Sequence, residues 1–522
     1  MTQLFLSIWD FQQPTKTEVT LASAAILLIY IFQRILAALY LTFFHPLSQF
    51  PGPPKAARSR PYIYTITGDH PEITLEKLHE QYREYRILLY TVLNLTGRPE
   101  TKALRIGPNE LHITDINQYK VIYSQIQPFP KDKEFYDAFN TPHTVVTESE
   151  VELHKERRRI LNPLFSRAES FKLEPIIHDK VEVLLGQINK LKVSQDINIY
   201  SAFRCLTTEI VMEFVFAKRE NLLDENNTTF ESWFLAAFDA AAESFWVMQE
   251  RPWLWKMSNY LPLSFVELVK PEAAHVFKLL KYAETCLQHY EKSGNTTSHP
   301  VLFDHLCTLP REFKVAEALI ILVAGSDTTA STLTTGLLHI LSNPLICEKL
   351  SRELSEADPS FQMLKLEKLK YLTACVKESL RIGMAVPGRL PRVVPQNLPQ
   401  PFIVDGKVIP AGTVVSMSAY TMHTNEEIWG PDARTFNPDR WLNPEAKSLE
   451  QYLCAFSKGA RMCLGQNVAL AEVTIIMAYM FRSFRMSLLP DAEPPRRKDL
   501  FTMGYEKPGL SLKLMDIVSK TQ

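Results

Sequence analysis

Near its C-terminal end the chain reads Phe456-Ser457-Lys458-Gly459-Ala460-Arg461-Met462-Cys463-Leu464-Gly465. The stretch sets one cysteine, Cys463, among glycines and cations. Positive charge and backbone N–H groups favour the thiolate that ligates haem iron, and glycines let the backbone fold tightly around the sulfur. An apolar helical pattern follows over residues 466–478, so the sulfur lies where a loop enters a helix N-terminus. The stretch therefore indicates a haem-thiolate ligand; a merely buried cysteine is the alternative.

These ten residues resemble, position for position, the haem-binding loop of the cytochrome P450 family, and the family's other motifs follow in order. The resemblance covers roughly residues 45–515. It implies a mainly α cytochrome P450 fold with a small β-rich lobe near residues 103–115 and 393–417. It also implies a haem b cofactor with Cys463 as the axial iron ligand. Phe456, Arg461 and Gly465 are further haem-binding candidates.

The amino-acid composition argues against several classes of partner and of site. With 57 basic and 58 acidic side chains the net charge is −1, which gives no electrostatic case for nucleic acid as a partner. The seven cysteines are odd in number and scattered, which argues against a disulfide framework and structural zinc and predicts a reducing compartment. Sequons at Asn94, Asn226, Asn227 and Asn295 are then expected to be unused. No repeat or low-complexity linker divides residues 61–522, so we expect one catalytic domain.

The N-terminal segment is far more apolar than the rest of the chain. Residues 21–44 are apolar apart from Gln33, Arg34 and a few small polar residues, and as a helix they span about 36 Å, enough for a bilayer core. We expect residues 1–44 to be a membrane anchor and the proline-rich residues 45–60 to be a hinge. A shallow, tilted helix with Arg34 snorkelling and a cleaved signal peptide are the alternatives. Basic residues after the segment place the body on the cytoplasmic side, and we expect the endoplasmic reticulum membrane.

A long apolar helix is predicted over residues 316–342, and it contains Ala324-Gly325-Ser326-Asp327-Thr328-Thr329. An acid and several hydroxyls inside an apolar helix are costly unless they serve a purpose. A simple helix kink at Gly325 is one interpretation. The resemblance implies the other, in which both residues are catalytic: Thr328 stabilises iron-bound peroxide and Asp327 helps to relay the protons that cleave the O–O bond.

Two further motifs predict a structural network. Glu378 and Arg381 lie three residues apart in a helix predicted over residues 364–381, so they share a face. Residues 436–441 match the family segment whose arginine, here Arg440, joins that pair. The resemblance implies that the three lock the loop that carries Cys463.

A basic helix is predicted to begin near His154. Its arginines could form a solvated face, but the resemblance places His154 and Arg158 over the haem propionates, with Arg461 opposite and Arg392 as a further candidate. His154 stands where many family members have tryptophan, and it can still donate a hydrogen bond. One departure from the family is residues 83–102, which are either a surface insertion or retained intron sequence.

The resemblance implies a monooxygenase that inserts one atom of O2 into a hydrophobic substrate. The chain has no dinucleotide or flavin motif, so electrons must come from a partner, expected to be NADPH-cytochrome P450 reductase, with cytochrome b5 as a further candidate. We expect the reductase to dock near Lys155, Arg157, Arg159 and Lys458. Candidate pocket residues are apolar: Phe129, Phe135, Phe139, Phe245, Trp246, Leu322, Ala324, Val386, Phe501 and Met503.

The loop and its surroundings look most like fungal members of secondary metabolism. We therefore expect a terpenoid substrate first and a polyketide or alkaloid second. Two rivals stay open: a haem-thiolate isomerase or dehydratase that works without O2, and a non-enzymatic membrane-tethered haem sensor. Neither needs Asp327 and Thr328.

Overall fold

The structure is a computed structural model of the 522-residue chain. It describes residues 15–67, 70–92, 102–224, 226–251, 253, 260, 262–269, 271–294, 297, 299–490 and 493–517.

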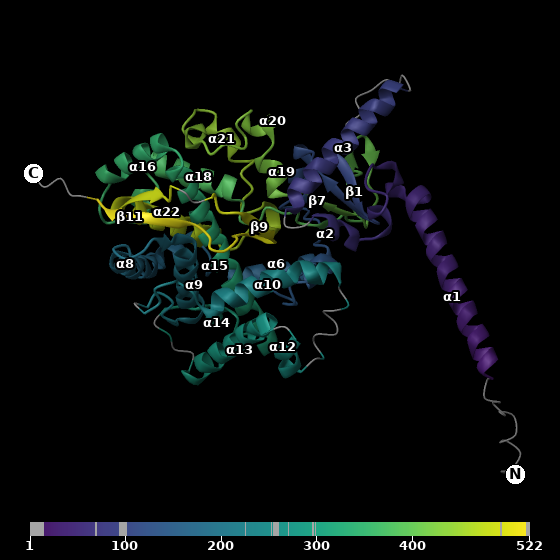
Figure 1. The fold of residues 1–522 in the computed structure, drawn as a ribbon, viewed down its shortest axis with the longest axis horizontal. Helices are drawn as coiled ribbons and strands as arrows, with labels where there is room; N and C mark the ends of the chain where they lie inside the picture. Colours follow the sequence, from purple (N-terminus) through teal and green to yellow (C-terminus); the bar gives the residue numbers. More distant parts are fainter. Residues whose placement is uncertain are drawn as a thin grey trace, which may run out of the picture.

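The body of the molecule is mainly helical, as the sequence predicted (Figure 1). Its longer helices are α3 (Pro71–Val92), α6 (Val151–Leu161), α8 (Glu174–Leu191), α9 (Ile199–Phe216), α10 (Trp233–Glu250), α13 (Pro271–Lys292), α15 (Arg311–Leu341), α16 (Pro344–Glu356), α18 (Lys370–Gly383) and α22 (Gln466–Ser483). Shorter helices are α2 (Pro61–Thr67), α4 (Tyr119–Ile122), α5 (Lys133–Asp137), α7 (Arg167–Lys172), α12 (Leu263–Val269), α14 (Leu302–His305), α17 (Met363–Leu366), α19 (Ala419–His423), α20 (Glu426–Trp429) and α21 (Ala446–Leu449).

Helix α15 passes through the core and packs along α9. Nearly every residue of α9 is buried. The two helices pack closely at Gly325, where a Cβ atom would stand 2.8 Å from Cγ2 of Val211. Glycine is therefore needed at this position for helix packing. The helix is continuous there, and the side-chain hydroxyls of Ser326 and Thr328 donate to the carbonyls four residues earlier. Such hydroxyls compete with the backbone N–H groups for these carbonyls, so the kink interpretation stays open.

A four-stranded sheet forms the predicted β-rich lobe. Its order is β1 (Ala103–Gly107), β2 (Glu110–Ile113), β7 (Val414–Ser416) and β4 (Arg392–Val393), with β2 and β7 parallel and the other pairs antiparallel. This joins the two segments that the sequence predicted. The smaller sheets are β3 (Ile197–Asn198) with β11 (Ser511–Asp516) and β8 (Phe484–Leu488), β9 (Arg497–Leu500) with β10 (Thr502–Tyr505), and β5 (Ile403–Val404) with β6 (Lys407–Val408).

The single helix predicted over residues 364–381 is wrong, because the chain forms two helices, α17 and α18. The carboxylate of Glu353 in α16 accepts hydrogen bonds from the N–H groups of Tyr371 (2.9 Å) and Leu372 (2.8 Å). These are free donors in the first turn of a helix. A carboxylate from a neighbouring helix thus lets a new helix start at Lys370.

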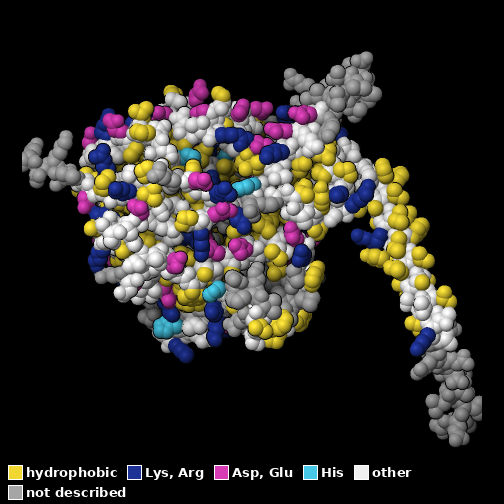
Figure 2. Space-filling view, viewed as in Figure 1, with side chains coloured by type: hydrophobic (Ala, Val, Ile, Leu, Met, Phe, Trp, Pro, Cys, Tyr) yellow, Lys and Arg dark blue, Asp and Glu magenta, His cyan; other side chains and the backbone are white. Residues whose placement is uncertain are grey.

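The N-terminal helix α1 (Lys16–Leu39) projects away from the body (Figure 1). Residues Val19–Phe44 are long and apolar enough to cross a membrane, and none of their hydrophobic window is buried in the protein. Figure 2 shows hydrophobic side chains along this helix. The segment is therefore a candidate membrane anchor. Two short turns, Pro46–Gln49 and Ala56–Arg58, follow in the predicted hinge.

The predicted insertion 83–102 is only partly described. Its first ten residues prolong α3 to Val92, and residues 93–101 lie outside the described residues.

Candidate active site around Cys463

The loop that carries Cys463 is fixed by its own backbone and by close packing. The N–H of Cys463 donates to the carbonyl of Phe456 over 2.8 Å and closes the loop. Gly459 has a φ of +71°, and a Cβ there would stand 2.2 Å from the carbonyl oxygen of Tyr123. Only glycine fits both conditions. The loop therefore reaches the segment after α4, where Ala460 donates to the carbonyl of Ser124 over 3.2 Å.

The Cys463 thiol lies deep in the protein yet is accessible. Its residue counts as exposed, but burial raises the pKa of the thiol, while the N–H of Gly465 and the charge of Arg158 act to lower it. The thiol therefore borders an internal space. Ala324, midway along α15, is likewise exposed although its helix crosses the core.

Positive charge is concentrated beside this loop. Burial and the charges of Arg461, Lys131, Arg158 and Arg392 lower the pKa of His154 to about 2. Burial and the three arginines hold the pKa of Lys131 well below its usual value, and Glu148 offsets part of the charge. Burial also lowers the pKa of Arg461 to about 10, with Arg392 contributing. Uncompensated buried charge is costly, so such a cluster suits an anionic partner.

The sequence analysis predicted that four of these residues lie together: His154, Arg158, Arg392 and Arg461. It missed Lys131, which belongs to none of the family motifs. Arg158 reaches the carbonyl of Met462 over 2.6 Å, next to the thiol. Arg392 donates to the hydroxyl of Tyr136 over 2.8 Å.

The residues present fit a haem. The Nε atom of Arg461 is buried without a hydrogen-bond partner within the described part of the chain. A Cβ on Gly465 would meet no protein atom within 4 Å, so the backbone after the thiol faces open space. Two propionates would neutralise the cation cluster, and a thiolate would bind the iron.

On α15 the predicted catalytic residues Asp327 and Thr328 already have hydrogen-bond partners within the protein. Both carboxylate oxygens of Asp327 accept from Arg204 of α9, at 2.8 and 2.9 Å. Arg204 also pairs with Asp239 of α10 at 2.7 Å. The hydroxyl of Thr328 donates to the carbonyl of Ala324 over 2.8 Å. Sequence reasoning missed Arg204, because no motif signals a partner more than one hundred residues away.

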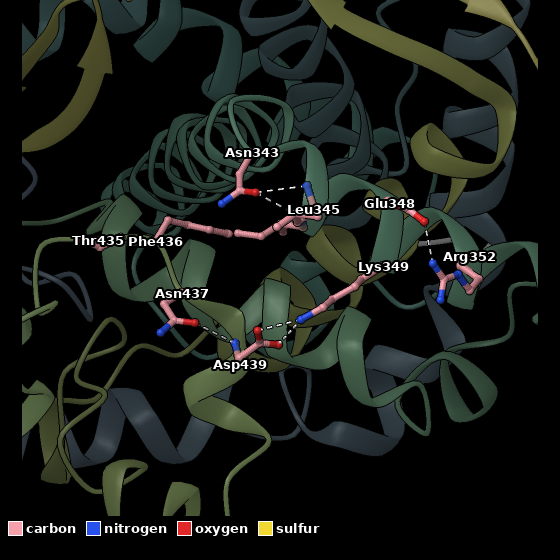
Figure 3. Close-up of a pocket in the computed structure, with 10 residues that line it drawn as sticks. Asn343, Leu345, Glu348, Lys349, Arg352, Thr435, Phe436, Asn437 and Asp439 are labelled. Atoms are coloured by element: carbon pink, nitrogen blue, oxygen red, sulfur yellow. Dashed lines mark hydrogen bonds and ion pairs between the residues drawn. The ribbon is translucent and has the colours of Figure 1, made fainter.

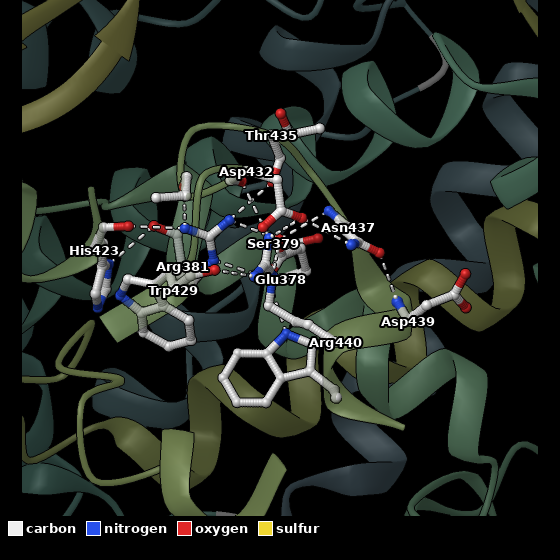
Figure 4. Close-up of polar contacts among 12 residues, drawn as sticks. Glu378, Ser379, Arg381, His423, Trp429, Asp432, Thr435, Asn437, Asp439 and Arg440 are labelled. Carbon is white, nitrogen blue, oxygen red and sulfur yellow. Dashed lines mark hydrogen bonds and ion pairs between the residues drawn. The ribbon is translucent and has the colours of Figure 1, made fainter. Parts of the chain in front are cut away.

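Glu378, Arg381 and Arg440 form a buried network, as predicted (Figure 4). The Oε1 atom of Glu378 accepts from Arg381 (2.7 Å), Arg440 (3.1 Å) and the N–H of Asn437 (2.8 Å). Its Oε2 atom accepts from Arg381 and from the indole of Trp441, both at 2.9 Å. Every acceptor of this fully buried carboxylate is thus used.

A histidine that the sequence gave no reason to single out connects the network to the Cys463 loop. His423 Nε2 accepts from the N–H of Cys454 over 2.9 Å, so the proton is on Nδ1, which donates to the carbonyl of Arg381 over 2.9 Å. Burial and Arg381 lower the pKa of His423 to about 3, so it stays neutral. The carbonyl of Cys454 accepts from Ser457 (2.8 Å), inside the loop.

Four of the predicted pocket phenylalanines meet. The rings of Phe139 and Phe501 lie 4.7 Å apart, as do those of Phe139 and Phe245, and Phe135 packs against Phe245 at 5.4 Å. Phe129 does not join them, since it is buried in the β-rich lobe against Phe402 at 5.5 Å. The pocket role of the aromatic group, of Ala324 and of half-buried Val386 stays a prediction.

Of the residues expected to dock a reductase, Lys155 and Arg159 are exposed and Lys458 is half-buried. Arg157 is wrong as a docking residue, because it is buried with its Nε 3.6 Å from Glu317.

A pocket of about 410 Å³ lies elsewhere on the molecule, between α16 and residues 435–439 (Figure 3). An ion pair between Lys349 and Asp439 (2.8 Å) spans it. It contains no residue of the Cys463 loop, so it is not the cofactor site.

Comparison with known proteins agrees with this geometry. The family model of the cytochromes P450 matches residues 62–514. The chain is 31% identical to cytochrome P450 monooxygenase MO6277 of Ascocoryne sarcoides, over 86% of this chain and 89% of that protein. It is 28% identical to cytochrome P450 monooxygenase aneF of Aspergillus aculeatus (89% and 93%) and 30% identical to conidiogenone synthase PchP450 of Penicillium rubens (85% and 88%). With a thiol loop, a cation cluster that suits a haem and a family match over most of its length, the chain belongs to the cytochrome P450 family of haem-thiolate monooxygenases.

Proposed function

We propose that the protein is a membrane-anchored monooxygenase of fungal secondary metabolism that holds haem b. It inserts one oxygen atom from O2 into a hydrophobic polycyclic intermediate, a terpenoid first and a polyketide or alkaloid second. Electrons come from NADPH-cytochrome P450 reductase, with cytochrome b5 as a possible second donor. The observation that carries the proposal is the buried cation cluster beside the Cys463 thiol.

When bound, the haem supplies the iron at which O2 is reduced. The chain's own residues do the rest. The neutral His154, which can donate a hydrogen bond, and the basic side chains of Arg158, Arg392, Arg461 and Lys131 hold the propionates. Arg204 fixes Asp327 through two hydrogen bonds, which places a carboxylate and the Thr328 hydroxyl on the same stretch of α15. These two groups position the water that supplies protons.

The aromatic group Phe135, Phe139, Phe245 and Phe501 supports an apolar substrate with extended ring surface, because such faces exclude water and pack against rings. The candidate anchor supports a location in the endoplasmic reticulum membrane with the body in the cytosol. Exposed Lys155 and Arg159 support docking of an acidic reductase surface.

Replacing Thr328 with alanine tests the function and its proton step together. We expect the wild type to form product only with reductase, NADPH and O2 present. We expect Thr328→Ala to keep haem and substrate binding but to yield several-fold less product per NADPH, because reduced oxygen is lost as hydrogen peroxide when proton delivery fails. Product, peroxide and NADPH consumption are measured in one assay. Turnover without reductase and O2 would instead support an isomerase or dehydratase, and haem binding without any turnover would support a sensor.

Removal of residues 1–44 tests the anchor. The segment makes almost no buried apolar contact with the body, so we expect most of the truncated protein to leave the membrane fraction with haem still bound. Fractionation and the absorbance spectrum check this. Loss of haem on truncation would show that the segment belongs to the core.

A further inference from the structure

Glu317, near the start of α15, is a fully buried carboxyl that the proposed mechanism does not use. Both of its oxygens lie within hydrogen-bond distance of the N–H of Val145, at 3.0 and 3.1 Å. Its Oε2 atom also lies 3.6 Å from Nε of Arg157, a buried residue of α6. A carboxyl is costly to bury, so the contacts that it makes need an explanation.

The N–H that Glu317 binds belongs to a largely buried turn ahead of α6, residues 144–148. The carbonyl of Thr144 accepts from the N–H groups of Thr147 (3.2 Å) and Glu148 (2.9 Å), and the hydroxyls of Thr144 and Thr147 lie 2.9 Å apart. Thr144 is 0% exposed, and Thr147 and Glu148 are each 7% exposed. The turn is thus closed by its own hydrogen bonds, and Glu317 ties it to α15.

The same turn holds two basic side chains of the haem site. Lys131 donates to the carbonyl of Val146, next to the residue that is held from α15. Arg461 donates to the carbonyl of Glu148 over 2.5 Å and to that of Ser149 over 3.0 Å. A displacement of the turn would therefore move acceptors away from both basic side chains.

We propose that Glu317 is a positioning residue for the haem. By accepting the N–H of Val145 it fixes the turn 144–148. The turn then keeps Lys131 and Arg461 in the cation cluster, where they hold the propionates. The link joins α15, which carries the predicted catalytic residues, to the haem site. The proposal rests on the proposed function only in that haem b occupies the cation cluster.

This role requires an acceptor of the right length rather than a charge. Burial raises the pKa of Glu317 to about 7, whereas the N–H of Val145 and the charge of Arg157 act to lower it. A protonated carboxyl still offers its carbonyl oxygen to the N–H of Val145. Glu317→Gln keeps an acceptor of the same length, whereas Glu317→Asp keeps the carboxyl but is one methylene shorter. The two substitutions therefore separate reach from charge.

Transfer of haem from the full-length holoenzyme to excess apomyoglobin measures how firmly the cofactor is held, without substrate or turnover. We expect Glu317→Leu to release haem about tenfold faster than the wild type, because it leaves the N–H of Val145 buried without an acceptor. Glu317→Asp should release haem several-fold faster, and Glu317→Gln at nearly the wild-type rate. Hydrogen exchange of residues 144–150 should become faster in the first two variants and stay unchanged in the third.

Glu209→Leu is the matched control. Glu209 is 2% exposed, its Oε1 atom accepts from the N–H of Leu222 over 2.7 Å, and its Oε2 atom lies 3.3 Å from Nζ of Lys180. The substitution removes the same kind of buried acceptor from contacts with residues outside the cation cluster. Below its unfolding temperature the control should release haem at the wild-type rate. Its propionate bands in the resonance Raman spectrum should be unchanged, whereas Glu317→Leu should shift those bands.

Wild-type haem release and wild-type propionate bands in Glu317→Leu would overturn the proposal. Equal haem release in Glu317→Gln and Glu317→Leu would also overturn it, because the acceptor would then be irrelevant. The same band shift and faster release in Glu209→Leu would count against it, since the effect would follow from lost stability alone. If Glu317→Leu does not fold, Glu317→Asp decides, and release at the wild-type rate would refute the role. A holoenzyme that fails the monooxygenase assay would leave these results untouched, since none of them involves turnover.

Discussion

Replacing Cys463 with alanine is expected to abolish the strongly red-shifted Soret band of the reduced carbon monoxide complex and all monooxygenase activity. The thiol is the one cysteine in the closed loop, and it borders the cation cluster that suits the propionates. An alanine there offers the iron no ligand, so the loss should be complete rather than graded. Absorbance spectra of the reduced protein with carbon monoxide provide the measurement.

Cys454→Ala is the matched control. Cys454 lies nine positions earlier and is 2% exposed, and burial raises the pKa of its thiol to about 12, so it stays a neutral thiol. Its N–H, which His423 accepts, survives the substitution. The control should therefore keep the red-shifted band. A band that persists in Cys463→Ala and disappears in Cys454→Ala would reverse the assignment.

Glu378→Gln is expected to reduce stability by about 3–5 kcal/mol, the usual range when one member of a buried charge network is removed. The amide would place an NH2 group where Oε2 now accepts from both Arg381 and Trp441, so donors would face donors. Two buried arginines would also lose their shared carboxylate. Thermal unfolding and the yield of haem-loaded protein measure the effect.

Glu450→Gln provides the comparison. Glu450 pairs with Lys377, the neighbour of Glu378, but its side chain is 53% exposed. An exposed pair contributes about 0–1 kcal/mol. Equal unfolding temperatures for the two variants would contradict the structural role of Glu378.

The sequence predicted those parts of the site that short motifs carry. The Cys463 loop, the Glu378 network and the β-rich lobe follow from local patterns, and the structure brings the members of each together. The family resemblance supplied the links between distant motifs, such as Arg440 with Glu378. Lys131, Arg204 and His423 belong to no such motif, so the sequence alone could not reveal their contacts with the site.

Other errors had a different cause. The break between α17 and α18 depends on a carboxylate in α16, which no local pattern within residues 364–381 reveals. Arg157 lies in a run of arginines that is typical of a solvent-exposed helix face. In the structure it is buried beside Glu317, with which it pairs. Phe129 is apolar like its neighbours, but side-chain type does not say which of two apolar clusters a ring will enter. These features depend on tertiary packing.

The wide spacing of the haem-binding residues has a consequence for the protein's synthesis. Lys131, His154 and Arg158 leave the ribosome early, whereas Arg461 and Cys463 follow roughly three hundred residues later, which at about 5–20 residues per second is on the order of a minute or less. The nascent chain cannot ligate iron during that interval. Iron ligation must therefore wait until translation is nearly finished, and any truncated chain that ends before Cys463 lacks the iron ligand.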